Sequence, residues 1–257
     1  YNMNNKKIKK IKDIFDKSII HKDLLFSLPF RIALVGRSGM GKTNILINLL
    51  DNNFYGKDFD SSNIFIISGS LSTDDKIKNL VKSRDIPLEN LYNGYKEDEM
   101  MELYDMLAQN YKIDLINEDD PKHNLVIFDD ISFSNSLKDK SGGAMDKFAC
   151  NSRKFLVSIV FTSQKYTQLS TCIRENLTGI ISASCSDRVL EAISDDFNYM
   201  GCKKQFRKVF RKLTDDAFTF FVCNLSNKKE NRYLNHNFEP ICVCEKDKKK
   251  CKNKVVI

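Results

Sequence analysis

Short apolar runs alternate with amphipathic stretches through most of the chain. The runs have the length of strands and lack the alternation of a half-exposed strand, which is typical of buried parallel strands. They predict strands over residues 31–36, 63–68, 124–131, 155–164 and 178–185. The amphipathic stretches predict helices over residues 42–50, 73–81, 97–111, 188–199 and 203–213, with Ser72 or Thr73 as a cap. This cadence indicates an α/β fold, a mostly parallel sheet flanked by helices on both faces.

The two ends of the chain depart from this pattern. Residues 218–224 and 232–238 predict a C-terminal β-hairpin joined by a turn. Ile8, Ile11, Phe15 and Ile19 recur at helical spacing among lysines, which predicts a basic amphipathic helix over residues 5–20. Such a helix packs on the body or a partner subunit, or else meets a membrane surface or nucleic acid. We therefore divide the chain into an N-terminal helical segment (1–26), a main domain (27–240) and a basic tail (241–257).

Composition narrows the class of protein. The chain has 257 residues, of which 42% are hydrophobic and 29% charged, a balance suited to one globular core. Its net charge of +7 fits an anionic partner without requiring one. No apolar run predicts a transmembrane segment, and the N-terminal residues do not resemble a secretory signal. The eight cysteines are scattered, which favours free thiols in a reducing compartment over a secreted disulfide framework.

The strongest chemical signal is the sequence GRSGMGKT, which matches GxxxxGK[ST] between a predicted strand and a predicted helix. In this motif, backbone N–H groups at a helix N-terminus surround the phosphates of a nucleotide. Lys42 is expected to bridge the β- and γ-phosphates of ATP, and the Thr43 hydroxyl to bind Mg²⁺. The alternative is a glycine turn beside an exposed lysine. The predicted nucleotide-binding residues are Gly36, Arg37, Ser38, Gly39, Met40, Gly41, Lys42 and Thr43.

Two acids end the predicted strand over residues 124–131. The carboxyl edge of a parallel sheet is where α/β folds bind ligands, so Asp129 is expected to hold Mg²⁺, through water. Asp130 would then orient the water that attacks the γ-phosphate, the alternative being a helix or turn cap. Gln164 ends the next strand and is a predicted sensor of the γ-phosphate; alternatively, its amide bonds loop backbone.

With these residues, the chain resembles the FtsK-HerA group of P-loop ATPases, and most closely its poxvirus-type genome-packaging members. The resemblance covers residues 28–195 and rests on GRSGMGKT, VIFDDI at 126–131, SRKFLVSIVFTSQ at 152–164 and IRENLTGIISASCSDR at 173–188. One departure is Lys154, where the viral branch commonly has His. The resemblance implies a RecA/ASCE-like fold and ATP hydrolysis that moves double-stranded DNA through a homo-oligomeric ring, a pentamer or hexamer, into preformed capsids. Capsid or vertex proteins are the further implied partners.

Ring ATPases of this type place an arginine of one subunit against the γ-phosphate bound by its neighbour. Arg153, Arg174 and Arg188 stand in motif-like surroundings, and we favour Arg174 and Arg188. A surface ion pair is the alternative role for each of them.

Basic residues cluster in two further places. Residues 203–213 predict a helix with an apolar side and a cationic side, and the latter suits sequence-independent contact with DNA phosphates. A solvated face or a subunit contact is the alternative. The residues of this proposed DNA contact are Lys204, Arg207, Lys208 and Arg211. The tail run 246–254 is expected to be disordered; the alternative is a contact with DNA or with an acidic capsid surface. Cys242, Cys244 and Cys251, with His236, form only a weak zinc signal because paired CxxC spacing is lacking.

The leading hypothesis is therefore an ATP- and Mg²⁺-dependent DNA translocase that packages a viral genome. It would act in the host cytoplasm or a viral factory during virion assembly, or in the virion. The alternatives are a HerA- or FtsK-like translocase without a packaging role, a small-molecule P-loop kinase, and a nucleotide-binding assembly protein without catalysis.

Overall fold

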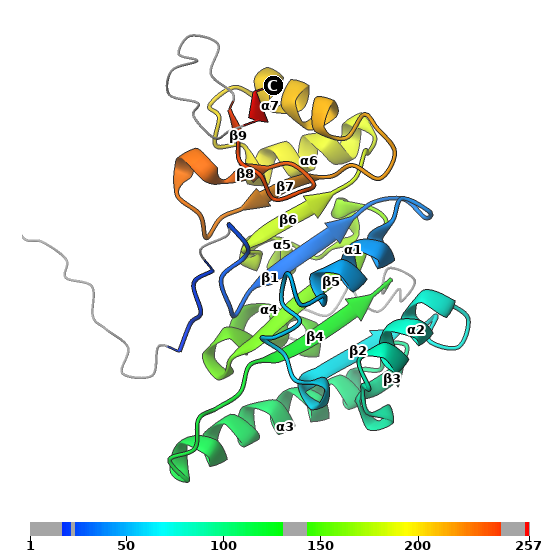
Figure 1. Ribbon diagram of the computed structural model, residues 1–257, viewed down its shortest axis with the longest axis vertical. Coiled ribbons are helices and arrows are strands. Elements are labelled where there is room, and N and C mark those ends of the chain that lie inside the picture. Colours follow the sequence, from blue (N-terminus) through cyan, green and yellow to red (C-terminus); the bar gives the residue numbers. More distant parts are fainter. Residues whose placement is uncertain (1–16, 22–23, 131–142, 243–254, 257) are drawn as a thin grey trace, which may run out of the picture.

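The computed structural model describes residues 17–21, 24–130, 143–242 and 255–256. One large sheet forms the centre of the protein, with strand order β3-β2-β4-β5-β1-β6-β7-β8 (Figure 1). The first six strands in chain order run parallel. They are Arg31–Val35 (β1), Ile64–Ser68 (β2), Leu91–Asn93 (β3), Asn124–Asp129 (β4), Val157–Ser163 (β5) and Gly179–Ser182 (β6).

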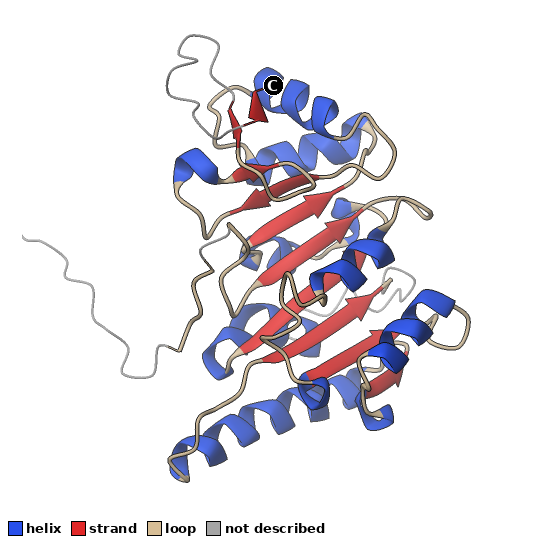
Figure 2. Ribbon diagram, in the orientation of Figure 1, coloured by secondary structure: helices blue, strands red, loops and turns tan. Residues whose placement is uncertain are grey.

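Helices cover both faces of this sheet (Figure 2). In the described part of the chain, each of the five connections between the parallel strands contains one α-helix, and two more follow β6. The first five are Lys42–Leu49 (α1), Asp75–Ser83 (α2), Glu97–Ile116 (α3), Ala144–Asn151 (α4) and Thr171–Asn176 (α5). The last two are Asp187–Phe197 (α6) and Lys203–Leu213 (α7). Short 3₁₀ helices occupy Ser61–Asn63 (η1), Leu88–Asn90 (η2), Ser152–Phe155 (η5), Tyr166–Gln168 (η6) and Lys229–Asn231 (η7). The predicted α/β class is confirmed.

Alternating strand residues build a separate core on each face of the sheet. Val126 and Phe128 of β4 pack with α3 to α7, whereas Leu125 and Ile127 pack with α1 and α2. All four are fully buried or nearly so, as expected for strands covered on both sides. Among the described residues, no helix has the length and apolar character needed to cross a membrane.

The predicted hairpin is present at the edge of the sheet. Phe221–Asn224 (β7) pairs antiparallel with β6 and with Tyr233–Leu234 (β8). In the tail, Ile241–Cys242 (β9) and Val255–Val256 (β10) form a small parallel pair. The run 246–254, expected to be disordered, lies outside the described residues.

The N-terminal segment differs from the prediction. Residues 1–16 lie outside the described part, and residues 17–21 are not helical; instead Ile19 exchanges two backbone hydrogen bonds with Leu28, at 3.1 and 2.9 Å. Leu25 and Phe26 are buried in the core, so the body of the fold begins before residue 27. Gly179 makes this packing possible, since a Cβ there would lie 2.3 Å from the Phe26 ring.

Among the α-helices and the strands of the main sheet, three elements were not predicted, namely β3, α4 and α5; the pair β9 and β10 and the 3₁₀ helices were not predicted either. Each is short, and neither α4 nor α5 has a long apolar stripe in the sequence. The helix over residues 97–111 extends to Ile116, and α2 is capped by Asp74, not by Ser72 or Thr73. The Asp74 carboxylate accepts a 2.8 Å hydrogen bond from the backbone N–H of Lys76.

Candidate nucleotide-binding site

The phosphate loop joins the carboxyl end of β1 to the start of α1. Gly39 and Gly41 have φ angles of 78° and 90°, the left-handed region that glycine enters without strain. Gly41 is the N-cap of α1 and no side chain caps this helix end. The first N–H groups of α1 therefore point toward the loop, where they can donate to an anion.

Lys42 folds back over this loop. Its Nζ donates to the backbone oxygen of Gly36 at 2.7 Å and to that of Arg37 at 3.3 Å. Burial lowers the pKa of Lys42, while the carboxylates of Asp130 and Asp129 act in the opposite direction. The lysine therefore lies within the electrostatic field of both acids, so the structure brings these three predicted residues into one site.

Asp129 is held in place by hydroxyl groups from the two strands beside β4. It is 6% exposed, and its Oδ2 accepts a 2.9 Å hydrogen bond from Oγ of Ser68 on β2. Oδ1 accepts a 2.7 Å hydrogen bond from Oγ1 of Thr162 on β5. Burial raises the pKa of Asp129, and these two donors oppose that rise because they stabilise the carboxylate. The two hydroxyls fix the direction in which the remaining lone pairs point.

Asp130 is held by the same threonine. Its backbone N–H donates to Oγ1 of Thr162 at 2.8 Å, and its φ of 44° lies in the left-handed region. Nε2 of Gln164 lies 3.5 Å from each oxygen of the Asp130 carboxylate. Gln164 thus faces the second acid.

Ser68 and Thr162 were not predicted as site residues; their signal is a polar residue at the end of an apolar strand.

The donor set fits a magnesium ion shared with a nucleotide. No group of three or more His, Cys, Asp or Glu side chains in the described residues could hold a metal alone. Mg²⁺ rarely uses such a cage; it binds through one or two carboxylates together with phosphate oxygens and water. Thr43, in the first turn of α1, and Asp129 are the side chains that would hold it.

A cavity of about 440 Å³ lies beside the phosphate loop. It is lined by Gly41 and one side of α1, and by residues from the C-terminal part of the chain. Phe218 lies at its wall, 60% exposed, and a Cβ on Gly41 would be 3.1 Å from the Phe218 ring. Sequence reasoning missed this cavity because its two walls are far apart in the chain.

The sequence matches the family described as Poxvirus A32 protein over residues 17–255, nearly the whole chain. The chain belongs to the poxvirus A32 protein family. The predicted relation to poxvirus-type ATPases is thereby confirmed, and so is the prediction of a P-loop ATPase. A search of curated proteins gave no significant match.

Two solved structures share the fold of this A32-family protein. One is the genome packaging NTPase B204 from Sulfolobus turreted icosahedral virus 2 in complex with AMP, with a TM-score of 0.55 and 17% identity over 83% of this chain and 98% of that chain. The other is B204, the DNA-packaging ATPase from Sulfolobus turreted icosahedral virus, with a TM-score of 0.53 and 14% identity over 84% and 99%. At these identities the likeness establishes the fold.

The three predicted arginines of the A32-family protein occupy different places. Arg188 is exposed in the first turn of α6. Arg174, on α5, forms a 3.1 Å ion pair with Asp196 and lies 5.6 Å from the centre of the Tyr166 ring. Arg153 is exposed in η5, just before β5 begins, at the opposite edge of the sheet from the phosphate loop.

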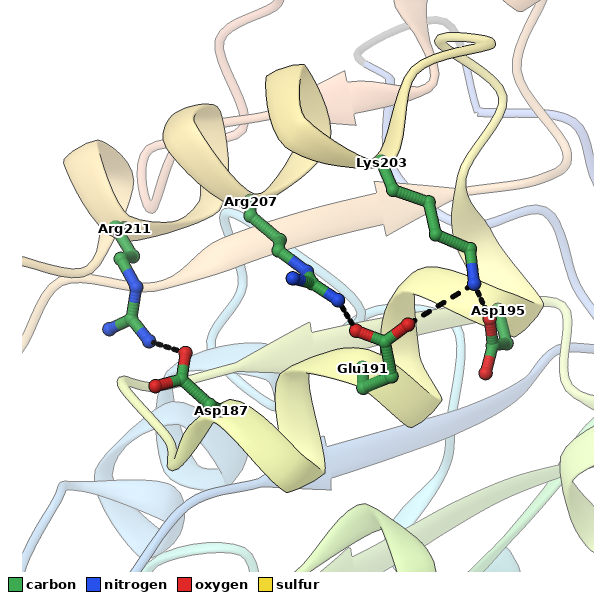
Figure 3. A network of polar contacts seen from close by, with 6 residues as sticks. All are labelled: Asp187, Glu191, Asp195, Lys203, Arg207 and Arg211. Carbon is green, nitrogen blue, oxygen red and sulfur yellow. Dashed lines mark hydrogen bonds and ion pairs between the residues drawn. The ribbon is translucent and has the colours of Figure 1, made fainter.

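The predicted DNA-contacting helix is α7, and part of its basic side faces α6 on the surface of the protein. Arg207 and Arg211 form ion pairs with Glu191 and Asp187 of α6 (Figure 3). Lys203 completes this ladder by contacting Glu191 at 3.2 Å and Asp195 at 2.5 Å. The two arginines are therefore engaged within the chain, because their i, i+4 spacing matches that of the α6 acids.

Lys204 and Lys208, the other two predicted contacts, are exposed on α7. The zinc signal falls largely outside the described part of the chain, since Cys244 and Cys251 lie there. His236 instead lines the cavity beside the phosphate loop.

Proposed function

We propose that this A32-family protein hydrolyses ATP to move double-stranded DNA into a preformed viral capsid, as a homo-oligomeric ring of five or six subunits. One observation carries the ATPase part: Asp129 and Asp130 are both fixed by Thr162 and lie in the field of Lys42. The packaging part is supported by the family and by the shared fold with two viral packaging proteins.

The phosphate loop would bind the triphosphate. Lys42 would exchange its backbone acceptors for the β- and γ-phosphate oxygens, and the first N–H groups of α1 would also donate to the phosphates. The base would enter the neighbouring cavity, where the exposed ring of Phe218 offers a stacking surface. Thr43 and Asp129 would hold Mg²⁺, whose charge offsets that of the phosphates.

Asp130 would position the attacking water. Its backbone is in the left-handed region and is held by the bond to Thr162, and its carboxylate lies 3.5 Å from Nε2 of Gln164. A glutamine amide can donate to a carboxylate or to a phosphate oxygen. Gln164 would therefore change partners when the γ-phosphate leaves, which suits the predicted role of a sensor.

DNA contact would fall to the outer face of α7. Lys204 and Lys208 are exposed, while Arg207 and Arg211 are engaged with α6. Lysines that meet phosphates carry no sequence information, which suits a motor that moves along any duplex. Arg174 and Arg188 remain the proposed contacts to the nucleotide of a neighbouring subunit.

Steady-state ATP hydrolysis with and without long duplex DNA tests the proposal. We expect DNA to stimulate phosphate release, Lys42→Ala to abolish it, and Asp130→Asn to abolish it while nucleotide binding persists. Turnover without any DNA binding at low salt, under conditions where the ring forms, would contradict the translocase part. Phosphate transfer to an acceptor other than water would favour a kinase, and unchanged release by Asp130→Asn would overturn the role of that acid.

A charge reversal on α7 tests the DNA contact separately. The double variant Lys204→Glu, Lys208→Glu should lose DNA stimulation at moderate salt and keep its DNA-independent turnover. Lys112→Glu is a matched control because Lys112 is exposed on α3, at the other end of the sheet (Figure 1). Binding of the ring to capsid or vertex proteins would separate a packaging motor from a translocase of another kind. Action in the host cytoplasm or a viral factory belongs to the same proposal.

A further inference from the structure

Two thiols from different helices meet on the surface of the protein. Sγ of Cys150, at the end of α4, lies 3.2 Å from Sγ of Cys172, in the first turn of α5. The two residues are 22 positions apart in the chain. A disulfide bond is about 2.0 Å long, so an approach of about 1 Å would join them.

Solvent reaches both side chains of this pair, since Cys150 is exposed and Cys172 partly so. Among the other described cysteines, Cys202 is also exposed and Cys185 partly so, whereas Cys223 is buried. Nδ2 of Asn176 donates to the backbone oxygen of Cys172 at 2.9 Å and lies 3.5 Å from Sγ of Cys150. The contact with Cys150 and a 3.4 Å hydrogen bond from Oγ of Ser170 to Oδ1 of Asp146 link α5 to α4, so the two thiols are held near each other without a covalent link.

The two thiols also differ in their readiness to react. Burial, followed by the hydrogen bond with Cys150, raises the pKa of Cys172 to about 12, and the carboxylate of Asp146 adds to this rise. Cys172 is therefore held as a thiol, and the exposed Cys150 is the sulfur that a soluble oxidant meets first.

We propose that Cys150 and Cys172 form a reversible disulfide by exchange with a small disulfide such as oxidised glutathione. The Cys150 thiolate attacks one sulfur of oxidised glutathione, which forms a mixed disulfide and releases one glutathione thiolate. Cys172 then gives its proton to the glutathione thiolate released in the first step and attacks Sγ of Cys150, which releases the second glutathione as a thiolate. The two cysteines are oxidised by two electrons, and oxidised glutathione is reduced to two glutathione molecules.

The bond would tie α4 to α5, the helix that carries Arg174. Arg174 is already held between Asp196 and the Tyr166 ring, so oxidation would further restrict a residue proposed to act on a neighbouring subunit. Disulfides of proteins in reducing compartments are commonly transient and regulatory. The disulfide itself does not depend on the proposed function, because it follows from the geometry of the two helices.

Peptide mapping of the full chain tests the proposal. The protein is equilibrated in glutathione buffers of increasing oxidised fraction, alkylated, and digested without reduction. We expect a linked peptide pair that contains Cys150 and Cys172, lighter than the reduced pair by two hydrogen atoms. Full alkylation of both residues, glutathione adducts that never resolve, or a link to other cysteines would overturn the proposal.

Serine variants and a second chemical probe test whether loss of the link has a cause other than misfolding. Cys150→Ser and Cys172→Ser should each lose the link, whereas the matched control Cys185→Ser should keep it. Thermal melting of each reduced variant establishes that it is folded. Phenylarsine oxide, which bridges two neighbouring thiols, should bind the reduced native protein and protect both cysteines from alkylation, and alkylation of both in its presence would contradict their proximity.

Discussion

Thr162 and Asp129 are joined across β4 and β5 by a hydrogen bond of 2.7 Å. The same hydroxyl accepts the backbone N–H of Asp130 at 2.8 Å, so one side chain on the middle strand fixes both acids of the site. A threonine hydroxyl can donate one hydrogen bond and accept others, which is the combination used here. The position of the carboxylates therefore depends on the strand that lies between them and the phosphate loop.

Replacement of Thr162 by valine should impair catalysis more than folding. Valine keeps the shape of the side chain but removes the donor to Asp129 and the acceptor for Asp130. We expect ATP turnover to fall by about tenfold or more and the free energy of unfolding by about 1–3 kcal/mol. Thr178→Val is a matched control, because Thr178 makes comparable backbone bonds to Arg31 at the other edge of the sheet. Equal loss of turnover in both variants would contradict a specific role for Thr162.

The phosphate loop should not tolerate a side chain at Gly41. Its φ is 90°, which costs a non-glycine residue about 1–2 kcal/mol, and the added Cβ would lie 3.1 Å from Phe218. Gly41→Ala should weaken binding of ATP by about tenfold, measured by calorimetry. Gly69→Ala has no heavy atom within 4 Å of its new Cβ and serves as the control. Unchanged ATP binding by Gly41→Ala would show that the loop does not use this conformation.

The ladder between α6 and α7 should contribute little stability, and its contribution should depend on salt. Glu191 contacts both Lys203 and Arg207 on the surface of the protein. Exposed pairs of this kind are worth about 0.2–1 kcal/mol each and are screened at high ionic strength. Glu191→Gln and Arg207→Gln should therefore show a coupling free energy of that size at low salt in a double-mutant cycle. At about 1 M salt, exposed charges are strongly screened. A coupling free energy that does not fall at this salt concentration would contradict a surface ion pair.

Stability should fall as the solution becomes acidic, in part because of His123. Burial lowers the pKa of His123 below its ordinary value of 6.5, although the Lys17 carbonyl and the carboxylates of Asp58 and Asp120 oppose this shift. The unfolded chain then binds the proton more readily, so the free energy of unfolding falls as the pH drops through about 6.5. His123→Gln should make the free energy of unfolding depend less on pH between about 5.5 and 7.5. Chemical denaturation at several pH values in this range measures the change. An unchanged slope would contradict the assignment.

The residues of the nucleotide-binding motifs were predictable from the sequence. GRSGMGKT and the acids after β4 are contiguous motifs, and the strands that carry them are uninterrupted apolar runs. Gln164 was predicted from its place at a strand end, and it faces Asp130. The carboxyl ends of parallel strands lie at the same edge of the sheet. A motif at the end of each strand is therefore enough to predict that these residues lie near one another.

Features that depend on tertiary contact could not be predicted. Thr162 looked like one of several polar strand-end residues, and nothing in the sequence tied it to Asp129. Arg207 and Arg211 carried the charge expected of a DNA contact, but the acids that engage them lie on a separate helix. The N-terminal segment has helical spacing, yet pairing of Ile19 with Leu28 replaces helix at its described end. Tertiary packing outweighed local propensity there.

The place of β5 between β1 and β4 has a mechanical consequence. A nucleotide bound by Lys42 after β1 and, through Mg²⁺, by Asp129 at the end of β4 would link the two strands that flank β5. A shift of any of these three strands would then disturb the bound nucleotide. Occupancy of the site should therefore stiffen the middle of the sheet, and departure of the product should relax it. Amide hydrogen exchange in β5 would then rise and fall with each step of the nucleotide cycle, so this strand would report whether the nucleotide site is occupied.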